Sequence, residues 1–373
     1  MVSRRPRPCK AYVNINIKIR GGGASVKRVE IRRPWKQAAK RGSYTITVRE
    51  THPIPAAALE SMKTTSLLDF CQTELTRIKS EDRYRVFPHL EKQADRFPIY
   101  THYPDDGSQV DDTVWCSNDY LGMGQSPIVT DPAREAAARV GAGGTRNIAG
   151  TSHYHILLED DLADLHAKEA PLLFTSGYVA NEATLSRLLN ARDNSITFFD
   201  EKNHALMIEG IRLSKAGKRI FSHNDLAHLE KLLADTDHDA HKFIAFESVY
   251  SMDGDIPPIG DICALSKRYA TVTYLDEIHA VGIYGAQGAG VAERDGVMAE
   301  VDLIEGTLAK GFGVHGGYVA GPAAVLDYLR SVAPGFIFTT SMPPMVAGAA
   351  LASVWHLKKA PRSERRSSVN KRS

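Results

Sequence analysis

Residues 271–277 read TVTYLDE, a short apolar run that ends on two carboxylates. Three further runs have a similar length and composition, namely SITFFD (195–200), KFIAFESVY (242–250) and DLIEGTL (302–308). Helical patterns such as DLAHLEKLLAD (225–235) lie between these runs. Short apolar strands that alternate with helices form βαβ units, so the sequence predicts an α/β fold with a mostly parallel sheet covered by helices.

The spacing of apolar residues predicts further elements on both sides of this region. Helices are expected over 65–79, 155–168 and 344–360, and TVWCSNDYLG (113–122) is strand-like. A glycine-rich stretch follows at 141–150. In a mostly parallel sheet the chemistry gathers at the carboxyl ends of the strands, so residues there are the first candidates for a functional site.

The composition is that of a globular protein, since 43% of the 373 residues are hydrophobic and 24% are charged. No apolar run approaches the roughly 18–20 residues that cross a bilayer. The net charge is only +2, and the basic excess lies in residues 1–61, which hold 14 Lys and Arg against 3 Asp and Glu. We therefore predict neither a nucleic-acid partner nor a membrane partner. No disulfide and no metal site is expected, because no cysteine pair has ligand spacing among Cys9, Cys71, Cys116 and Cys263.

Residues 1–61 combine RRPRP, GGG and PIPAA with no sustained helical period, which predicts a basic, poorly ordered extension. The segment is Arg-rich and acid-poor, as mitochondrial transit peptides are, so the mitochondrial matrix is an alternative to the cytoplasmic location that we predict. A third interpretation, which we favour, takes Met62 as the true start of the protein. At the other end, the polar and basic tail PRSERRSSVNKRS (361–373) is not expected to pack a core.

Lys310 lies in GTLAKGFGVHGGY (306–318), directly after a predicted buried strand and among glycines. Small neighbours let a flat cofactor approach the backbone, and a lysine in a partly dry pocket has a lowered pKa. Such an amine can form a Schiff base with an aldehyde. A lysine beside glycine is also common at solvent-facing positions, so this stretch alone leaves a structural interpretation open.

Asp276 ends a predicted apolar strand, where an unpaired carboxylate would be costly. A protonated pyridinium nitrogen would pair with it and could then accept carbanion electrons. His279, three residues later, could reach a hydroxyl of the same ring. The structural alternative is a strand-end aspartate that caps the next helix.

Other candidates lie at further strand ends. His204 follows SITFFD and could stack on a pyridine ring, although a core histidine is the ordinary alternative. TSGYVANEA (175–183) is a small-residue turn into a helix, whose first backbone N–H groups form an anion site for a phosphate. Ser251 and Thr307 carry short hydroxyl side chains suited to phosphate contacts.

The order of these features, a small-residue turn, a histidine, Asp-x-x-His and then Thr-x-x-Lys, resembles that of fold-type I pyridoxal-phosphate enzymes over residues 62–358. Within this class the chain is similar to the α-oxoamine synthases and most of all to the 5-aminolevulinate synthase family. Eight collinear blocks carry the resemblance: RYRVF (83–87), VWCSNDYLGMG (114–124), GGTRNIAGT (143–151), NHALMIEGIR (203–212), FESVYSMDGD (246–255), DEIHAVGIYG (276–285), GVAERDG (290–296) and GFIFTTSMPP (335–344).

The resemblance implies an acyltransferase that uses pyridoxal 5′-phosphate to condense glycine with succinyl-CoA, giving 5-aminolevulinate, CoA and carbon dioxide in haem biosynthesis. It implies that Lys310 binds the cofactor and removes a glycine proton. Asp276 would pair with the ring nitrogen, His279 would bind the ring oxygen, and His204 would stack on the ring. The further cofactor-contacting positions are Gly177, Tyr178, Ser251 and Thr307.

The resemblance also implies a homodimer with shared active sites. Thr339 and Thr340 match a pair that reaches the phosphate bound by the neighbouring subunit. The positions that match contacts to glycine, the succinyl group or coenzyme A are Arg85, Asn118, Thr145, Asn147, Ile148 and Lys218.

Family members carry a small C-terminal domain that supplies an arginine for the glycine carboxylate. Here the resemblance stops near Lys358, so we expect that domain to be largely missing and the activity to be impaired. The expected domains are a basic extension (1–61), an N-terminal arm (62–122), a cofactor-binding catalytic domain (123–354) and a stub with a basic tail (355–373).

Two other functions stay open from the sequence. One is a sister α-oxoamine synthase, such as 8-amino-7-oxononanoate synthase or 2-amino-3-ketobutyrate CoA ligase. Arg85 favours the succinyl-specific enzyme, because a guanidinium pairs bidentately with a free carboxylate. The other is a non-catalytic, truncated paralogue that keeps the cofactor or a partner chain without turnover.

Overall fold

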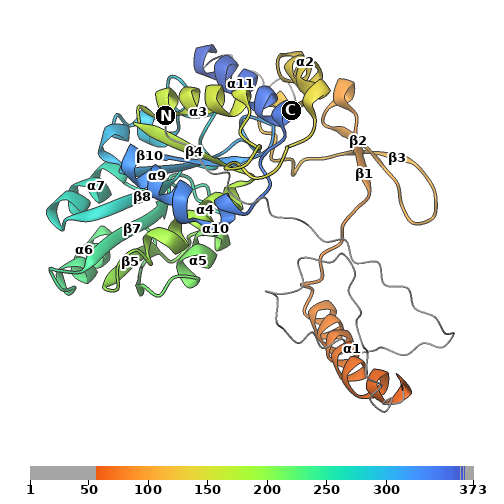
Figure 1. Cartoon of the computed structure of the whole chain (residues 1–373), viewed down its shortest axis with the longest axis horizontal. Helices are drawn as coiled ribbons and strands as arrows, with labels where there is room; N and C mark the ends of the chain where they lie inside the picture. The colour runs from red at the N-terminus through yellow and green to blue at the C-terminus, as the bar shows by residue number, and fades with distance from the viewer. Residues whose placement is uncertain (1–55, 362, 364, 366–373) are drawn as a thin grey trace, which may run out of the picture. The chain divides into compact units, whose positions relative to one another are not determined.

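The computed structural model describes residues 56–361, 363 and 365, and the chain divides into two compact units at Phe87 (Figure 1). The described part of the first unit contains α1 (Ala56–Ser80), which confirms the helix predicted over 65–79. Most of the predicted extension, residues 1–55, lies outside the described residues, but residues 56–61 are helical rather than irregular. None of the described helices combines the length and the apolar character that a membrane span needs.

The second unit is built on a seven-stranded sheet. In spatial order its strands are β4 (Ala170–Phe174), β10 (Gly317–Gly321), β9 (Leu303–Thr307), β8 (Thr271–Asp276), β7 (His241–Glu247), β5 (Ser195–Asp200) and β6 (Gly217–Phe221). The strands from β9 to β6 run parallel, whereas β10 is antiparallel to both β9 and β4. The predicted mostly parallel α/β sheet is therefore confirmed, and the four predicted strands are neighbours in it.

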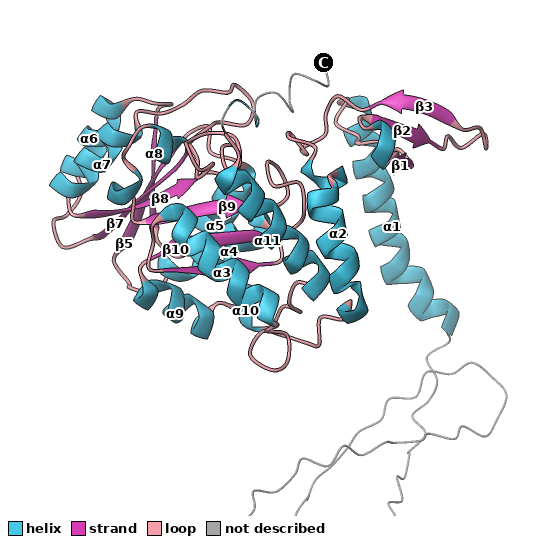
Figure 2. Ribbon diagram, turned by 90° about the horizontal axis from the view of Figure 1, so that it is seen from above, coloured by secondary structure: helices cyan, strands magenta, loops and turns pink. Residues whose placement is uncertain are grey.

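Helices cover both faces of this sheet (Figure 2). The helices of the first face, the α4 face, are α4 (Gly177–Leu188), α5 (Ala205–Arg212), α9 (Ala323–Val332) and α10 (Pro334–Ile337). Those of the opposite face, the α11 face, are α3 (His153–His166), α6 (Leu226–Ala234), α7 (Ile259–Arg268) and α11 (Pro344–Lys359), with α2 (Pro127–Ala136) against α11. Strand side chains alternate between the two cores, so Tyr274 belongs to the α4 face and Leu275 to the α11 face.

A second, antiparallel sheet consists of β1 (Leu90–Lys92), β2 (Ile99–His102) and β3 (Val110–Thr113). The predicted strand over 113–122 is wrong, because β3 ends where that strand was expected to begin. Instead the Asp119 carboxylate accepts hydrogen bonds from the Gly124 N–H (3.1 Å) and the Gln125 amide (2.7 Å), which folds the chain into a turn. The remaining short helices are η2 (Ala94–Arg96), η3 (Met123–Gln125), η4 (Ala137–Arg139), α8 (Val291–Arg294) and η5 (Met298–Glu300).

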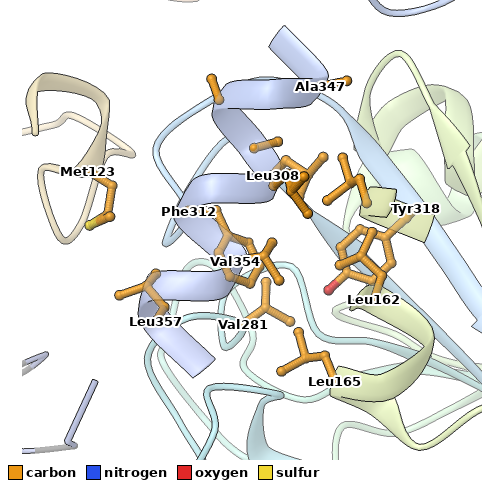
Figure 3. Close-up of a cluster of buried hydrophobic side chains, with 14 of the residues drawn as sticks. Met123, Leu162, Leu165, Val281, Leu308, Phe312, Tyr318, Ala347, Val354 and Leu357 are labelled. Carbon is orange, nitrogen blue, oxygen red and sulfur yellow. The ribbon is translucent and has the colours of Figure 1, made fainter. Parts of the chain in front are cut away.

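Apolar packing on the α11 face holds the loops that follow β8 and β9. Figure 3 shows Val281, from the loop after β8, in the same buried cluster as Leu308 and Phe312, from the loop after β9. Leu162 of α3 and Val354 of α11 belong to the same buried cluster. Burying a side chain of this size contributes about 1.5–3 kcal/mol relative to exposure, so this cluster fixes both loops at the carboxyl edge of the sheet.

Among the described residues of the basic tail, Arg365 differs from the prediction. Arg365 is buried, and its guanidinium donates hydrogen bonds to the carbonyl oxygens of Leu357 (2.8 Å), Gly285 (2.6 Å) and Ala286 (2.8 Å). These carbonyls belong to the last turn of α11 and to the loop after β8. A cationic side chain at a helix C-terminus also opposes the helix dipole, so Arg365 stabilises this end of α11.

Candidate active site

Three acidic side chains, the carboxylate row, lie side by side at the carboxyl edge of the main sheet. Glu247, Asp276 and Glu305 are in register on β7, β8 and β9. All three point to the α4 face, because each lies two residues beyond a strand residue of that core. Their exposed fractions are 2%, 3% and 0%. Adjacent strands are about 4.8 Å apart, so the row brings like charges close enough to oppose simultaneous ionisation.

Asp276 is the member of the row with the most hydrogen-bond donors. The backbone N–H of Ile278 donates to its Oδ1 (2.8 Å), and the side-chain amide of Asn181 donates to its Oδ2 (3.1 Å). Burial raises the pKa of Asp276, whereas these two donors and the nearby Lys310 lower it. Asp276 is thus the acid of the row best able to carry a negative charge, at the strand end where the sequence placed it.

Lys310 lies just after β9 and shares the surroundings of Asp276. Burial lowers the pKa of Lys310, and the three acids of the row raise it, Asp276 most strongly. The next residue has to be small, since a Cβ on Gly311 would lie 2.2 Å from the carbonyl oxygen of Val281. This close approach seats the lysine loop directly against the loop after β8, so the predicted amine and the predicted carboxylate meet at one site.

A chain of polar contacts runs outward from the lysine. Lys310 Nζ lies 2.6 Å from His279 Nε2, and His279 Nδ1 lies 2.9 Å from the hydroxyl of Tyr120. That hydroxyl donates to Asn118 Oδ1 at 3.4 Å, which leaves its oxygen to accept from His279. Burial, with the charge of Lys310, lowers the pKa of His279 to about 4, so the ring is neutral at pH 7.

His204 is both a helix cap and a neighbour of the amine. Its Nδ1 accepts the N–H of Leu206 at the start of α5 (3.2 Å), and its own backbone N–H donates to Glu247. Burial lowers the pKa of His204, and the charge of Lys310 lowers it further. A neutral imidazole therefore lies close to Lys310, in agreement with the sequence-based grouping of the two residues.

The start of α4 reaches the same edge of the sheet. A Cβ on Gly177 would lie 3.0 Å from Ile278 Cδ1 and 3.3 Å from Glu305 Oε1, so a side chain here would require both neighbours to shift, and glycine lets the helix begin close to the carboxylate row without that adjustment. Ser176 caps the helix by accepting the N–H of Val179. The N–H groups of Gly177 and Tyr178 precede that capped amide, at the end of a helix that favours anions.

The two predicted hydroxyl residues differ in their surroundings. The Thr307 hydroxyl is buried at the end of β9, where it donates to the Gly316 carbonyl (2.9 Å) and accepts the Ala309 N–H (3.2 Å). Thr307 therefore shapes the turn that leads to Lys310. Ser251 is exposed in the turn that follows β7.

A second group of predicted residues meets near the end of α10. Thr145 and Thr340 form an isolated antiparallel bridge, although they lie far apart in the sequence. Thr339 and Thr340 line a small pocket together with Arg146. The Thr145 hydroxyl donates to Asn147 Oδ1 (2.6 Å), and both Asn147 and Ile148 are exposed. The predicted substrate loop and the predicted threonine pair are thus neighbours within one chain.

Two predicted substrate residues are not gathered with the others. Lys218 is exposed on the edge strand β6, beside Thr197 near the amino end of β5. Three strand spacings of about 4.8 Å separate β6 from β8, so this lysine lies at the far edge of the sheet from Asp276. Arg85 belongs to the first unit of the chain, outside the unit that contains the carboxylate row.

Four residues of the site were not predicted from the sequence: Tyr120, Asn181, Glu247 and Glu305. The two glutamates end or nearly end apolar strands, as Asp276 does, and that shared position was a signal that could have found them. Tyr120 and Asn181 gave no comparable signal, because their roles depend on contacts with residues 159 and 95 positions away.

Comparison with known proteins gives consistent matches. The family described as aminotransferase class I and II matches residues 110–368. A 5-aminolevulinate synthase of Rhizobium meliloti is 57% identical over 291 residues, which is 78% of this chain and 72% of that protein. The enzyme of Rhodobacter capsulatus that carries the same name is 54% identical over 288 residues, 77% of this chain and 70% of the relative.

Solved structures agree with the sequence matches. A serine palmitoyltransferase from S. paucimobilis, with a bound PLP–myriocin aldimine, superposes with a TM-score of 0.70 at 28% identity. The match covers 79% of this chain and 73% of that one. An 8-amino-7-oxononanoate synthase from Francisella tularensis superposes with a TM-score of 0.58 at 26% identity, over 67% of this chain and 70% of the other.

Proposed function

Because the chain belongs to the 5-aminolevulinate synthases, within the class I and II aminotransferase family, we propose that it condenses glycine with succinyl-CoA to 5-aminolevulinate. CoA and carbon dioxide are the other products, and the reaction is the entry to haem biosynthesis. The observation that carries the proposal is the meeting of Lys310, His279 and Asp276 at one edge of the sheet.

Pyridoxal 5′-phosphate fits the residues at this edge. Lys310 is the cation that affects the pKa of all three acids of the carboxylate row, so among the described residues the row holds more acid than opposing base. A pyridinium nitrogen would supply a second cation and would pair with Asp276. The aldehyde would reach the amine of Lys310, and the phosphate would accept the N–H groups of Gly177 and Tyr178. When bound, this cofactor supplies an electron sink for the α-carbon of glycine.

The residues of the chain would divide the remaining work. Lys310 takes the α-proton of glycine at Nζ, because burial favours the uncharged amine. His279 accepts from that amine through Nε2 and is itself oriented by Tyr120. His204 contributes an uncharged ring beside the amine, which suits it to cover a flat cofactor. Thr307 holds the turn before Lys310, and Ser251 offers a hydroxyl to the phosphate.

The substrate and partner assignments extend the same proposal. Arg85 pairs bidentately with the succinyl carboxylate. Thr339 and Thr340 reach the phosphate bound by a second copy of the chain, so the working form is a homodimer with shared sites. The remaining substrate contacts are Asn118, Thr145, Asn147, Ile148 and, for coenzyme A, Lys218. The catalytic domain spans 123–354, preceded by the arm 62–122, and the enzyme works in the cytoplasm.

The experiment combines turnover with mapping of the cofactor linkage. The purified chain, loaded with pyridoxal phosphate, is expected to form 5-aminolevulinate and free CoA from glycine and succinyl-CoA. Borohydride reduction is expected to attach the cofactor to the peptide that contains Lys310. Lys168 is the matched control, because burial also lowers its pKa but its amine donates to the carbonyls of Met298 and Val301.

Three outcomes would overturn the proposal. A reduced adduct on Lys168 but not on Lys310 would show that the cofactor does not bind at the carboxylate row. Turnover with acetyl-CoA in place of succinyl-CoA would identify a sister α-oxoamine synthase. A normal cofactor band that neither glycine nor succinyl-CoA changes would identify a non-catalytic relative.

A further inference from the structure

Glu305 belongs to the carboxylate row but has no role in the reaction as proposed above. It is fully buried, and among the described residues neither of its carboxylate oxygens has a hydrogen bond of normal geometry. Leaving a buried polar group unpaired costs about 1–3 kcal/mol, and more when the group is charged. A side chain kept at this cost beside Asp276 is therefore a candidate for a role in the site.

The charges of the row favour an uncharged Glu305. Asp276 has two donors. Glu247 accepts one N–H, that of His204, and burial together with the charge of Asp276 raises the pKa of Glu247 to about 8, so Asp276 is the acid of the row best able to hold a charge. Burial raises the pKa of Glu305 well above its ordinary value, and the neighbouring Asp276 raises it further. The charge of Lys310 lowers the pKa of Glu305, but this one cation lowers the pKa of Glu247 and Asp276 as well, so it cannot neutralise three negative charges.

Asn181 connects Glu305 to Asp276. The Tyr274 hydroxyl donates to Asn181 Oδ1 (2.9 Å), which fixes the orientation of this fully buried amide and turns its NH₂ group toward the acids. One N–H donates to Asp276 Oδ2 at 3.1 Å. The same amide also lowers the pKa of Glu305, so its nitrogen lies near both carboxyl groups.

We propose that Glu305 is a positioning residue of the cofactor site, whose carboxyl group stays uncharged and, through Asn181, sets Asp276 as the single anion that meets the ring nitrogen. This inference rests on the proposed function, since the ring nitrogen is that of pyridoxal phosphate. A second charge beside Asp276 would repel it and would compete for the same cation. An uncharged acid instead fills the space next to Asn181 and holds the amide against Asp276.

The first arm of the test reads the protonation of Glu305 without any cofactor. Infrared difference spectra of wild type against Glu305→Gln at pH 7.5 are expected to contain a carboxylic-acid carbonyl band that the variant lacks. Glu277→Gln is the matched control, because Glu277 is equally buried but points to the α11 face, and it should leave the Glu305 band in place. Loss of a carboxylate band in Glu305→Gln, with no acid band lost, would overturn the proposal.

The second arm measures the dissociation constant of pyridoxal phosphate and the position of its visible absorption band. Glu305→Gln stays uncharged and keeps donors, so it should bind within about threefold of wild type, with an unchanged band. Glu305→Leu should bind about tenfold more weakly or worse, because without the acid the Asn181 amide is no longer held in its hydrogen bond to the charged Asp276. Glu305→Met, unbranched and similar in length, replaces the leucine variant if that one does not fold.

The outcomes separate this inference from the proposed function. Wild-type affinity in the leucine or methionine variant would remove the positioning role, and a tenfold loss in Glu305→Gln would mean that the charge matters instead. If wild type binds no pyridoxal phosphate at all, the proposed function fails, and the positioning role with it. The infrared arm would in that case still report whether Glu305 is protonated.

Discussion

The two faces of the main sheet bury acidic side chains in opposite ways. On the α11 face, Glu277 accepts the N–H groups of Val291 (3.0 Å) and Ala292 (2.8 Å), one with each oxygen. On the α4 face, one residue away, Asp276 shares a row with Glu247 and with Glu305, whose oxygens have no partner of normal geometry among the described residues. Both groups are nearly inaccessible to water.

This difference separates buried acids that stabilise the fold from buried acids that are available to bind a ligand. A second acid of the α11 face, Glu159, forms a two-pronged ion pair with Arg146 (3.0 and 2.9 Å) and also accepts the N–H of Leu173. Its hydrogen-bonding capacity is used by the protein itself. The carboxylate row keeps part of that capacity free, as a site that receives a ligand has to do.

The largest effect is expected from a substitution in the carboxylate row on the α4 face. Asp276→Asn keeps the shape of the side chain but removes the charge, so it should lower the turnover number by at least about 10²-fold. The folded state should lose little stability, because the asparagine oxygen can still accept the N–H of Ile278. The hydrogen bond from Asn181 is lost, but removing a buried charge beside Glu247 and Glu305 offsets that loss. Turnover and the urea midpoint, measured side by side, test this. A loss of stability as large as the loss of turnover would show that the two faces do not differ in kind.

The second substitution removes a buried acid from the α11 face, where we expect an effect on stability instead of on the site. Glu277→Gln places an NH₂ group where an oxygen accepts a backbone N–H, so two donors face each other. The free energy of unfolding should fall by about 1–3 kcal/mol, while the absorption band of the bound cofactor stays in place. Urea titration and the visible spectrum of the same sample are the measurements. An altered band with unchanged stability would contradict the assignment of Glu277 to the fold.

The stability of the protein measured at several pH values tests a buried histidine of the α11 face, His166. Burial lowers the pKa of His166 on the α11 face to about 3, and its Nε2 lies 2.8 Å from the Tyr318 hydroxyl. In the unfolded chain this histidine binds a proton near pH 6.5, whereas in the folded chain it stays neutral down to about pH 3. The free energy of unfolding therefore falls as the pH drops below 6.5. From pH 7.5 to 5.5 this histidine should account for about 1.4 kcal/mol.

The variant His166→Leu should flatten that part of the slope, whatever its effect on the stability at pH 7.5. The exposed His238 provides the matched control, because His238→Leu should leave the slope as it is in wild type. Urea midpoints at several pH values give the slope for each protein. An identical slope in wild type and His166→Leu would mean that this histidine does not resist protonation.

The smallest expected effect tests how far the α4-face site extends. Tyr120→Phe removes the hydroxyl that lies 2.9 Å from His279 Nδ1, and one neutral hydrogen bond is worth about 0.5–1.5 kcal/mol. Turnover should therefore fall about tenfold or less, with little change in cofactor affinity. Tyr103→Phe is the control, since its hydroxyl bonds to Glu91 in the second sheet. Equal turnover in both variants would remove Tyr120 from the site.

The sequence was sufficient for those parts of the site that follow from position along a strand. Asp276 and Lys310 were predicted because each ends or follows an apolar run, and parallel strands bring such ends together. Glu305 could have been found from its position in an apolar strand, but its place beside Asp276 depends on the register of β9 against β8. Asn181 was missed because its role depends on the phase of α4. Neither quantity can be read from local periodicity.

Two local predictions failed for a common reason. The apolar pattern at 113–122 indicated a strand, but hydrogen bonds to the Asp119 side chain replaced the pairing that a strand needs. The composition of the tail predicted no packing, yet Arg365 found three carbonyl oxygens at the end of α11 and in the loop after β8. In both cases one side chain met backbone groups that periodicity and composition do not describe.

The cluster of Figure 3 sets an order of events during synthesis. The loops that carry His279 and Lys310 rest on Val354 and its neighbours in α11, which the ribosome makes about 45 residues after the lysine, a delay of several seconds at 5–20 residues per second. Until that helix emerges, these loops lack the apolar surface that fixes them. The loops around Lys310 are therefore fixed only after α11 has emerged, so a nascent chain that stalls before residue 344 would present this lysine on an unsupported loop.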